Sequence, residues 1–244
     1  MSGAHLSICF RQKKRHLNGE IWRRCSSSDP QRRIARDLNI SRTTVAKKFK
    51  WLGKLKKQSH KQFLEALGEV HEIYFDDLKT YIHTPCRPVS ISFAVTKDRK
   101  ILGFSIARCI PNSQRLIDVH KKKYGPLVDE TSDSFRNLLE QVKPYVAQGA
   151  VLITDEHPVY PGHIAEIYPC HPHKRHKSKR ESIAGQGELK EKGKDPLFPI
   201  NHTFAMIRAH VARLVRKTWC TSKTIEGLTN HLNLYIHYHN TVLT

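Results

Sequence analysis

Apolar residues in the first quarter of the chain recur at helical spacing between runs of basic residues. Residues 17–24 and 31–38 each predict a short helix, and a serine-rich stretch ending in Pro30 separates them. Ser41 is a favoured N-cap for a third helix that we expect to reach about Leu52. Beyond it, residues 53–58 predict a basic hinge and residues 59–69 a connecting helix.

After residue 70 the spacing changes to the alternation that is typical of β-strands. Residues 72–81, 87–97 and 101–110 predict three consecutive antiparallel strands, the last two joined by a polar hairpin turn. The pattern then predicts an amphipathic helix over residues 131–146 and a strand covered on both faces over residues 149–154. A short strand over residues 165–168 and two helices over residues 202–216 and 224–238 complete the prediction.

This order of elements is that of an RNase H-like fold, a mixed β-sheet flanked by helices. We therefore expect an α/β protein with a helical DNA-binding domain over residues 1–58, the connecting helix, and an RNase H-like domain over residues 70–244. Residues 171–194 form a basic insertion in that domain. Its composition is typical either of an irregular surface loop or of an arm that follows phosphates, and both interpretations stay open.

The charge of the chain indicates a polyanionic partner. The formal net charge is +20, and residues 1–60 hold sixteen Lys and Arg against three acids. A membrane surface is the competing partner, but no apolar run reaches the ~20 residues that a membrane span needs. The first ten residues are too short and mixed for a signal peptide. Six scattered cysteines predict reduced thiols in a cytoplasmic protein.

A tight turn followed by a capped basic helix is typical of a helix-turn-helix, whose last helix lies in the major groove of DNA. The competing interpretation is a basic helical hairpin with a solvated charged face. Agreement between the turn, the cap and the charge favours double-stranded DNA as the partner. The candidate DNA-contacting residues are Arg32, Arg33, Arg42, Thr43, Thr44, Lys47 and Lys48.

Two aspartates lie at the ends of apolar runs that predict core strands. Asp76 follows the run 72–75 and Asp155 follows the run 149–154. A carboxylate in such a place is costly unless a positive group meets it. The ends of the first and fourth strands of an RNase H-like fold lie side by side, so the two aspartates would meet and bind Mg²⁺ that acts on phosphate. Each aspartate alone is equally typical of a strand end or turn, and Asp77 would point to the opposite strand face.

A third ligand is expected near the start of the helix after the last strand. Asn201 occupies that place, and Arg208 lies two turns further on the same helical face. An asparagine offers Mg²⁺ a carbonyl oxygen without charge, and the competing interpretation is a simple helix N-cap. The rival third acids are Asp195, Glu188, Glu191 and Glu226.

Four stretches resemble bacterial insertion-sequence transposases, and the resemblance covers nearly the whole chain. These are residues 10–18, 31–36, 154–160 and 200–220. The most similar group has a catalytic triad of Asp-Asp-Glu or Asp-Asp-Asn followed by a basic residue. The resemblance implies that Asp76 and Asp155 are the two aspartates, Asn201 the third metal ligand and Arg208 the basic residue.

The resemblance also implies an activity and its setting. It implies DNA cleavage and strand transfer at inverted-repeat ends with Mg²⁺ (or Mn²⁺), by a homo-oligomer that brings element ends and target together in the bacterial cytoplasm, at the nucleoid. No membrane partner is expected. Two other functions stay open: a catalytically defective copy that only binds DNA, as a repressor does, and an RNase H-like nuclease of another kind.

The N-terminus departs from the pattern of the group. Its members usually begin with a four-cysteine zinc ribbon, and this chain starts near the end of that module. Cys9 and Cys25 have no partners at zinc-ligand spacing, so no zinc is expected. The sequence is therefore interpreted as a truncated copy, a fragment from a shifted start, or one frame of a longer product.

Overall fold

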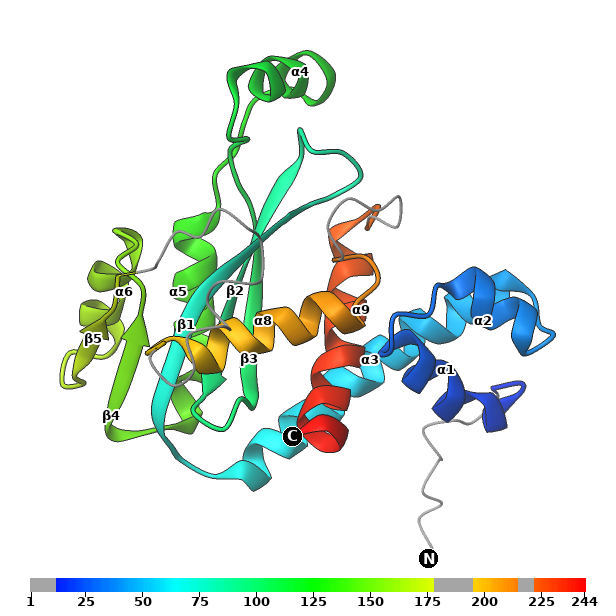
Figure 1. The fold of residues 1–244 in the computed structure, drawn as a ribbon, viewed down its shortest axis with the longest axis horizontal. Helices are drawn as coiled ribbons and strands as arrows, with labels where there is room; N and C mark the ends of the chain where they lie inside the picture. The colour runs from blue at the N-terminus through cyan, green and yellow to red at the C-terminus, as the bar shows by residue number, and fades with distance from the viewer. Residues whose placement is uncertain (1–11, 178–194, 215–221) are drawn as a thin grey trace, which may run out of the picture.

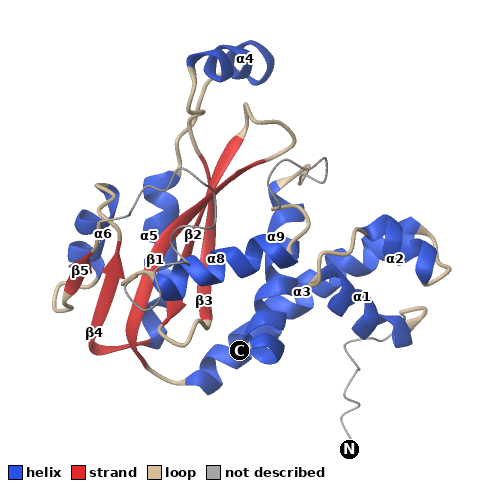
Figure 2. Ribbon diagram, in the orientation of Figure 1, coloured by secondary structure: helices blue, strands red, loops and turns tan. Residues whose placement is uncertain are grey.

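A mixed sheet with helices on both faces forms the body of the protein, and helices from the N-terminal part lie to one side (Figures 1 and 2). The computed structural model describes residues 12–177, 195–214 and 222–244. The protein is α/β, as the sequence predicts. Among the helices of these ranges, none is both long and apolar enough to cross a membrane.

The sheet combines antiparallel and parallel neighbours. Its strands are β1 (Val70–Tyr81), β2 (Pro88–Thr96), β3 (Ile101–Arg108), β4 (Val146–Thr154) and β5 (His173–Arg175). Their order across the sheet is β3-β2-β1-β4-β5. The first three strands are consecutive and antiparallel, as predicted, whereas β4 runs parallel to β1 and β5 runs parallel to β4.

Each face of the sheet is covered by its own pair of helices. One face packs against α8 (Phe198–His210) and α9 (Ile225–Tyr238), and the other against α5 (Thr131–Val142) and α6 (Val159–Ile167). Short helical segments complete the described parts: the 3-10 helices η1 (Arg15–Leu17) and η2 (Lys143–Tyr145), and the C-terminal π-helix η3 (His239–Leu243).

Alternation along β1 divides its side chains between the two faces. Tyr74 and Leu78 join the apolar cluster under α8 and α9, whereas Ile73 and Phe75 join the cluster under α5 and α6. Successive side chains of a strand point to opposite faces. Asp76, between Phe75 and Asp77, therefore belongs to the face that α8 covers.

The N-terminal helices pack on the body instead of standing apart from it. α1 (Asn18–Cys25) and α2 (Gln31–Asp37) share a buried cluster with α3 (Arg42–Leu67) and with Leu234 of α9. The Trp22 indole N–H donates to the Leu234 carbonyl at 3.0 Å, and His231 hydrogen-bonds the Cys25 carbonyl at 2.8 Å. Helix α9 is therefore a common support for the N-terminal helices and the sheet.

Helix α3 is continuous, so the expected hinge over residues 53–58 is wrong. Ser41 caps it as predicted, since its hydroxyl oxygen accepts the Thr44 backbone N–H at 3.1 Å. Lys, Leu and Gln dominate the residues after Gly53, and these residue types favour helix strongly enough to carry the chain past one glycine. The connecting helix over residues 59–69 is the last part of α3, which ends at Leu67.

Three further elements differ from the expectation. The predicted strand over residues 165–168 is the end of α6, where Tyr160, Ile164 and Ile167 are buried at helical spacing. Helix α4 (Gln114–Tyr124), which buries none of its side chains, was not predicted; most of its residues are polar or charged. Helix α8 begins before the predicted residue 202 and ends at His210, and residues 215 and 216 lie outside the described ranges, as do 178–194 of the insertion.

Candidate active site

Asp76 and Asp155 meet because β1 and β4 are parallel neighbours. In that pairing Phe75 lies opposite Thr154, so Asp76 and Asp155 are the next residues along adjacent strands. The structure thus brings together the two aspartates that sequence spacing separates by almost eighty residues. The Asp155 carboxylate accepts the His157 backbone N–H at 2.9 Å, which holds the turn that leads from β4 into α6.

Asp77 and Tyr160 lie on the opposite face of β1. The Ser90 hydroxyl donates to Asp77 Oδ2 at 3.0 Å, and the Asp77 carboxylate also lies beside the Tyr160 hydroxyl. Burial of the Tyr160 hydroxyl raises its pKa well above the usual value, and the negative charges of Asp77, Asp76 and Asp155 raise that pKa further. Tyr160 is thus a neutral hydroxyl close to three carboxylates.

Asn201 lies in the first turns of α8, half-buried, and hydrogen-bonds a carboxylate. Its amide nitrogen donates to Asp195 Oδ2 at 2.9 Å. The other oxygen of Asp195 accepts the Leu197 backbone N–H at 2.9 Å, so Asp195 holds the start of the helix. The N-cap position of α8 is Leu197, so the alternative interpretation of Asn201 as a cap is wrong. With its nitrogen engaged, the Asn201 amide has its oxygen left for another partner.

Helix α8 places Asn201 and Arg208 over the sheet. Ile200, Phe204 and Ile207 are buried against the cluster that contains Tyr74 of β1, and α8 crosses in front of β1 (Figure 1). Asn201 follows Ile200, and Arg208 lies seven residues further on, half-exposed on the same helical side. Both residues therefore sit on the helix that covers the Asp76 face.

The rival third acids are placed differently. Asp195 precedes α8 and is tied to Asn201, as described above. Glu226, at the start of α9, pairs with Lys50 at 3.8 Å. Glu188 and Glu191 lie outside the described residues. Asp195 is thus the rival that the structure links to the candidate third ligand.

The donor set of Asp76, Asp155 and Asn201 consists of oxygen atoms, which Mg²⁺ and Mn²⁺ accept. Within the described part of the chain, no group of three or more His, Cys, Asp or Glu side chains is arranged to hold a metal ion. The two carboxylates are the charged ligands that this place offers, and the neutral Asn201 amide is the candidate third ligand. That set fits Mg²⁺, which keeps several waters and is commonly held by one or two carboxylates.

Most candidate DNA-contacting residues are on the surface of α2 and α3. The exposed members are Arg32, Arg33, Arg42, Thr43 and Lys47, and Thr44 is half-buried beside its cap. Lys48 is only 6% exposed, and its ammonium donates to the Asn18 side chain at 2.6 Å. The expectation that Lys48 faces DNA is therefore wrong. It lies on the inner side of α3, one position from the exposed Lys47.

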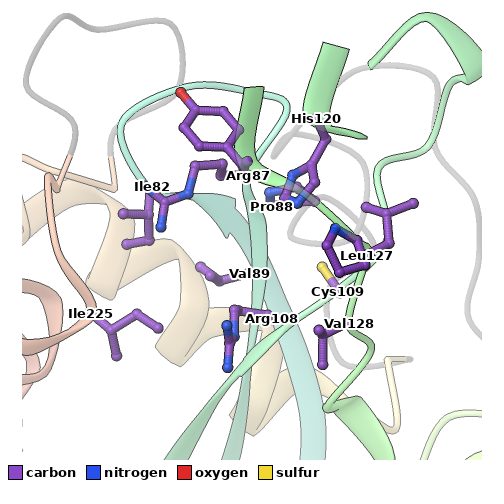
Figure 3. A pocket seen from close by; sticks show the side chains of 12 residues that line it. Ile82, Arg87, Pro88, Val89, Arg108, Cys109, His120, Leu127, Val128 and Ile225 are labelled. Carbon is purple, nitrogen blue, oxygen red and sulfur yellow. The ribbon is translucent and has the colours of Figure 1, made fainter. Parts of the chain in front are cut away.

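A separate small pocket lies beneath α4, at the ends of β1, β2 and β3 (Figure 3). Its volume is about 110 Å³. The Arg108 guanidinium in its wall pairs with Glu130 at 2.5 Å, and the His120 ring hydrogen-bonds the Cys86 carbonyl at 2.7 Å. Burial raises the pKa of the Cys109 thiol to about 11, so this cysteine is not a thiolate nucleophile near neutral pH. These polar groups hold the fold, and the pocket is a weaker candidate than the aspartate pair.

Several groups around the aspartates escaped the sequence interpretation. Tyr160 is one, and Asp195, as the partner of Asn201, is another. His173 of β5 is a third: its ring hydrogen-bonds the Thr154 hydroxyl at 2.9 Å, next to Asp155. The pairing of β5 with β4 makes this contact, and the sequence pattern placed no strand there.

No protein-family model matches the sequence, and no curated protein matches it significantly.

Proposed function

We propose that this protein is a DNA transposase: a Mg²⁺-dependent enzyme that cuts and joins DNA at the ends of an insertion element. The observation that carries the proposal is the pairing of Phe75 with Thr154, which makes Asp76 and Asp155 neighbours at one place in the sheet. The strand order β3-β2-β1-β4-β5 supports assignment of the sheet to the RNase H-like fold. The basic N-terminal helices supply the DNA-binding part.

The roles of the side chains follow from their chemistry. Asp76, Asp155 and the Asn201 amide oxygen would hold Mg²⁺, which, when bound, activates a water or a 3′-hydroxyl and stabilises the leaving oxygen of phosphoryl transfer. Arg208 carries the positive charge on α8 that suits a phosphate oxygen. The buried Tyr160 hydroxyl stays protonated near the carboxylates and adds no charge to the site.

The N-terminal helices fit a helix-turn-helix. Asn39 adopts the left-handed conformation, with φ of 48°, in the tight turn between α2 and α3. Ser41 then caps α3, whose first turn exposes Arg42 and Thr43. The major groove of an element end is the ligand that such a helix suits. A protein with this role acts at the bacterial nucleoid, as an oligomer that holds two DNA ends.

The proposal is tested by DNA cleavage. A plasmid that carries the coding region with its natural flanking DNA is incubated with the purified protein in Mg²⁺, and nicked, linear and joined products are measured. Asp76→Asn and Asp155→Asn should each reduce cleavage by at least ~100-fold, because metal ligation contributes several kcal/mol to phosphoryl transfer. Asp98→Asn, which changes an exposed aspartate in the β2–β3 turn, is the matched control and should keep full activity.

A second function is favoured by one observation: the basic surface of α2 and α3 does not depend on the aspartates. If the protein binds its flanking DNA but cleavage is absent and Mg²⁺ has no effect, it is a DNA-binding protein of the repressor type. Full cleavage by Asp155→Asn would instead reject the proposed active site. Cleavage of DNA without inverted repeats, lost in the same variants, would indicate a nuclease.

A further inference from the structure

Five lysines form a stripe along the exposed side of α3. Their spacing alternates between three and four residues, which keeps them on one face of a helix. All five are exposed: Lys47, Lys50, Lys54, Lys57 and Lys61. With a rise of 1.5 Å per residue, the stripe is about 21 Å long. It begins at Lys47, in the recognition segment (residues 42–47, the start of α3 that is proposed to enter the major groove), and continues past it without a break, because α3 has no hinge.

The second half of the stripe enters a groove. Two adjoining hollows, of about 680 and 480 Å³, share lining residues from α3 and α9 and extend to the outer edge of β3. Lys57 and Lys61 line both of them, and Lys54 lines the first. Helices α3 and α9 cross beside β3 (Figure 1), so the groove follows the junction between the N-terminal helices and the sheet.

Little negative charge opposes these lysines. In the described part of the chain, Lys54 and Lys57 pair with no carboxylate. Lys61 lies 3.9 Å from Glu65, and the Glu226 carboxylate at the groove wall lies 3.8 Å from Lys50. Exposed pairs at such distances contribute little energy, so the lysines are available to a polyanion.

The floor of the groove also holds an unsatisfied donor. Asn230 of α9 lines the groove and is 4% exposed, yet its side-chain amide nitrogen has no hydrogen-bond partner among the residues described. A buried N–H without a partner costs about 1–3 kcal/mol. Asn233, one turn further along α9, lines both hollows. The Asn230 nitrogen is itself buried, so the exposed lysines carry the contacts of the groove with phosphate oxygens.

We propose that this groove binds the sugar–phosphate backbone of duplex DNA, as a second DNA contact next to that of the recognition segment. The proposal rests on the proposed function only in taking DNA as the polyanion, and it requires no cleavage. Lys54, Lys57 and Lys61, which are exposed, neutralise the phosphates that lie in the groove. Such contacts carry no base sequence information, so they strengthen binding to all duplexes alike.

The test is the salt dependence of DNA binding by the full chain. Fluorescence anisotropy with a labelled duplex is measured in EDTA, where no metal-dependent cleavage occurs. In the variant Lys54→Gln/Lys57→Gln/Lys61→Gln, the slope of log affinity against log salt should become shallower by about 2.7, since each phosphate contact contributes about 0.9. The loss should be equal for a duplex from the flanking DNA and for an unrelated duplex. Arginine at the same three positions should restore the slope.

The matched control removes three exposed lysines from α4: Lys121→Gln/Lys122→Gln/Lys123→Gln. It makes the same change in net charge and should leave the slope unaltered. An unaltered slope in the α3 variant, with an unchanged unfolding midpoint, would overturn the proposal, and so would an equal loss in the α4 variant. Asp155→Asn could have no effect on plasmid cleavage while the α3 variant shows the shallower salt dependence of DNA binding. That combination would support the DNA-binding groove and reject the proposed active site.

Discussion

Asn201 is better understood together with Asp195 than alone. The amide is neutral, but its nitrogen donates to a carboxylate at 2.9 Å. A hydrogen bond of this kind polarises the amide and increases electron density on the oxygen that faces other partners. Asp195 would therefore influence a cation held at Asn201 without ligating it. The residue that appeared as a rival third acid in the sequence is, in the structure, the hydrogen-bond partner of the candidate third ligand.

Histidines in and beside α9 couple folding to pH. Burial, followed by the positive charge of Arg213, lowers the pKa of His231 to about 4. Burial also lowers the pKa of His237 and of His239 to about 4. These rings are therefore neutral in the folded protein at pH values where an unfolded chain, with a histidine pKa of about 6.5, is protonated.

The sign of the resulting pH dependence follows from proton uptake. Between about pH 6.5 and 4 the unfolded state binds more protons, so the free energy of unfolding should fall as the pH is lowered through this window. Urea unfolding at pH 7, 6 and 5 measures the slope. His231→Gln, which can still donate to the Cys25 carbonyl, should make the slope shallower, whereas His16→Gln changes an exposed ring and should not. An unchanged slope in His231→Gln would contradict this role.

At the scale of elements, α3 and α9 fit together at one glycine. A Cβ at Gly53 would lie 2.7 Å from the Cβ of Asn230 and 2.9 Å from its Cα. Such contacts are closer than real Cβ atoms allow, and one of them is to backbone that cannot rotate away. Gly53 thus sets the distance between the two helices, which explains why a helix interior tolerates glycine here.

Gly53→Ala should lower the free energy of unfolding by about 1–3 kcal/mol, the usual cost of overpacking. The matched control is Gly19→Ala in α1, where an added Cβ meets no atom within 4 Å. The control should gain up to about 1 kcal/mol from the better helix propensity of alanine. Chemical denaturation of both variants measures the difference. Equal stability of the two variants would show that α3 and α9 are not in close contact.

The elements that the sequence predicted well are those whose apolar residues recur at a regular spacing. Strands β1 to β3 alternate clearly, and α9 has a Thr224 cap and a regular apolar stripe. The failures have physical causes. A glycine in a basic run suggested a hinge, although its neighbours favour helix. Residues 165–168 are too few to separate a short strand from a helix by their pattern, and the contacts of α6 with α5 decide for a helix.

At the scale of the whole molecule, α9 joins the two parts. Leu234 packs with the N-terminal helices, while Leu232, Tyr235 and Ile236 pack with the sheet. Neither side can lose its structure without exposing a face of α9. The predicted boundary at residue 58 therefore falls inside the continuous helix α3, whereas the boundary at residue 70 coincides with the start of β1. Helix α3 also contributes to both parts, since Phe49 and Leu52 pack with the N-terminal helices and Leu64 packs with the sheet.

This sharing predicts a single unfolding transition. Urea unfolding followed by far-ultraviolet circular dichroism should coincide with that followed by fluorescence of Trp22, measured in a variant with Trp51→Phe and Trp219→Phe. Trp22 reports on the junction, because its indole bonds Leu234 and contacts Lys56, whose ammonium lies 3.6 Å from the ring centre. Two separate transitions would mean that the N-terminal helices fold independently of the sheet.

The candidate site was predictable in part from the order of the elements. Asp155 follows the end of β4 and Asn201 lies near the start of α8, as the order of elements indicated, whereas Asp76 lies in the middle of β1 and not at its end. The contacts of Tyr160, His173 and Asp195 were not predictable, because they depend on the packing of α6, the pairing of β5 and the entry into α8. None of these contacts leaves a periodic signal in the sequence.

The unbroken course of α3 has a consequence for chain length. A helix turns by about 100° for each residue, so one residue inserted between 54 and 61 would rotate the N-terminal helices by about 100° relative to the sheet. An insertion of four residues would leave a rotation of only about 40° but shift those helices by about 6 Å. Either change would separate Trp22 from Leu234 and divide the lysine stripe. The number of residues in this helix is thus as constrained as their identity.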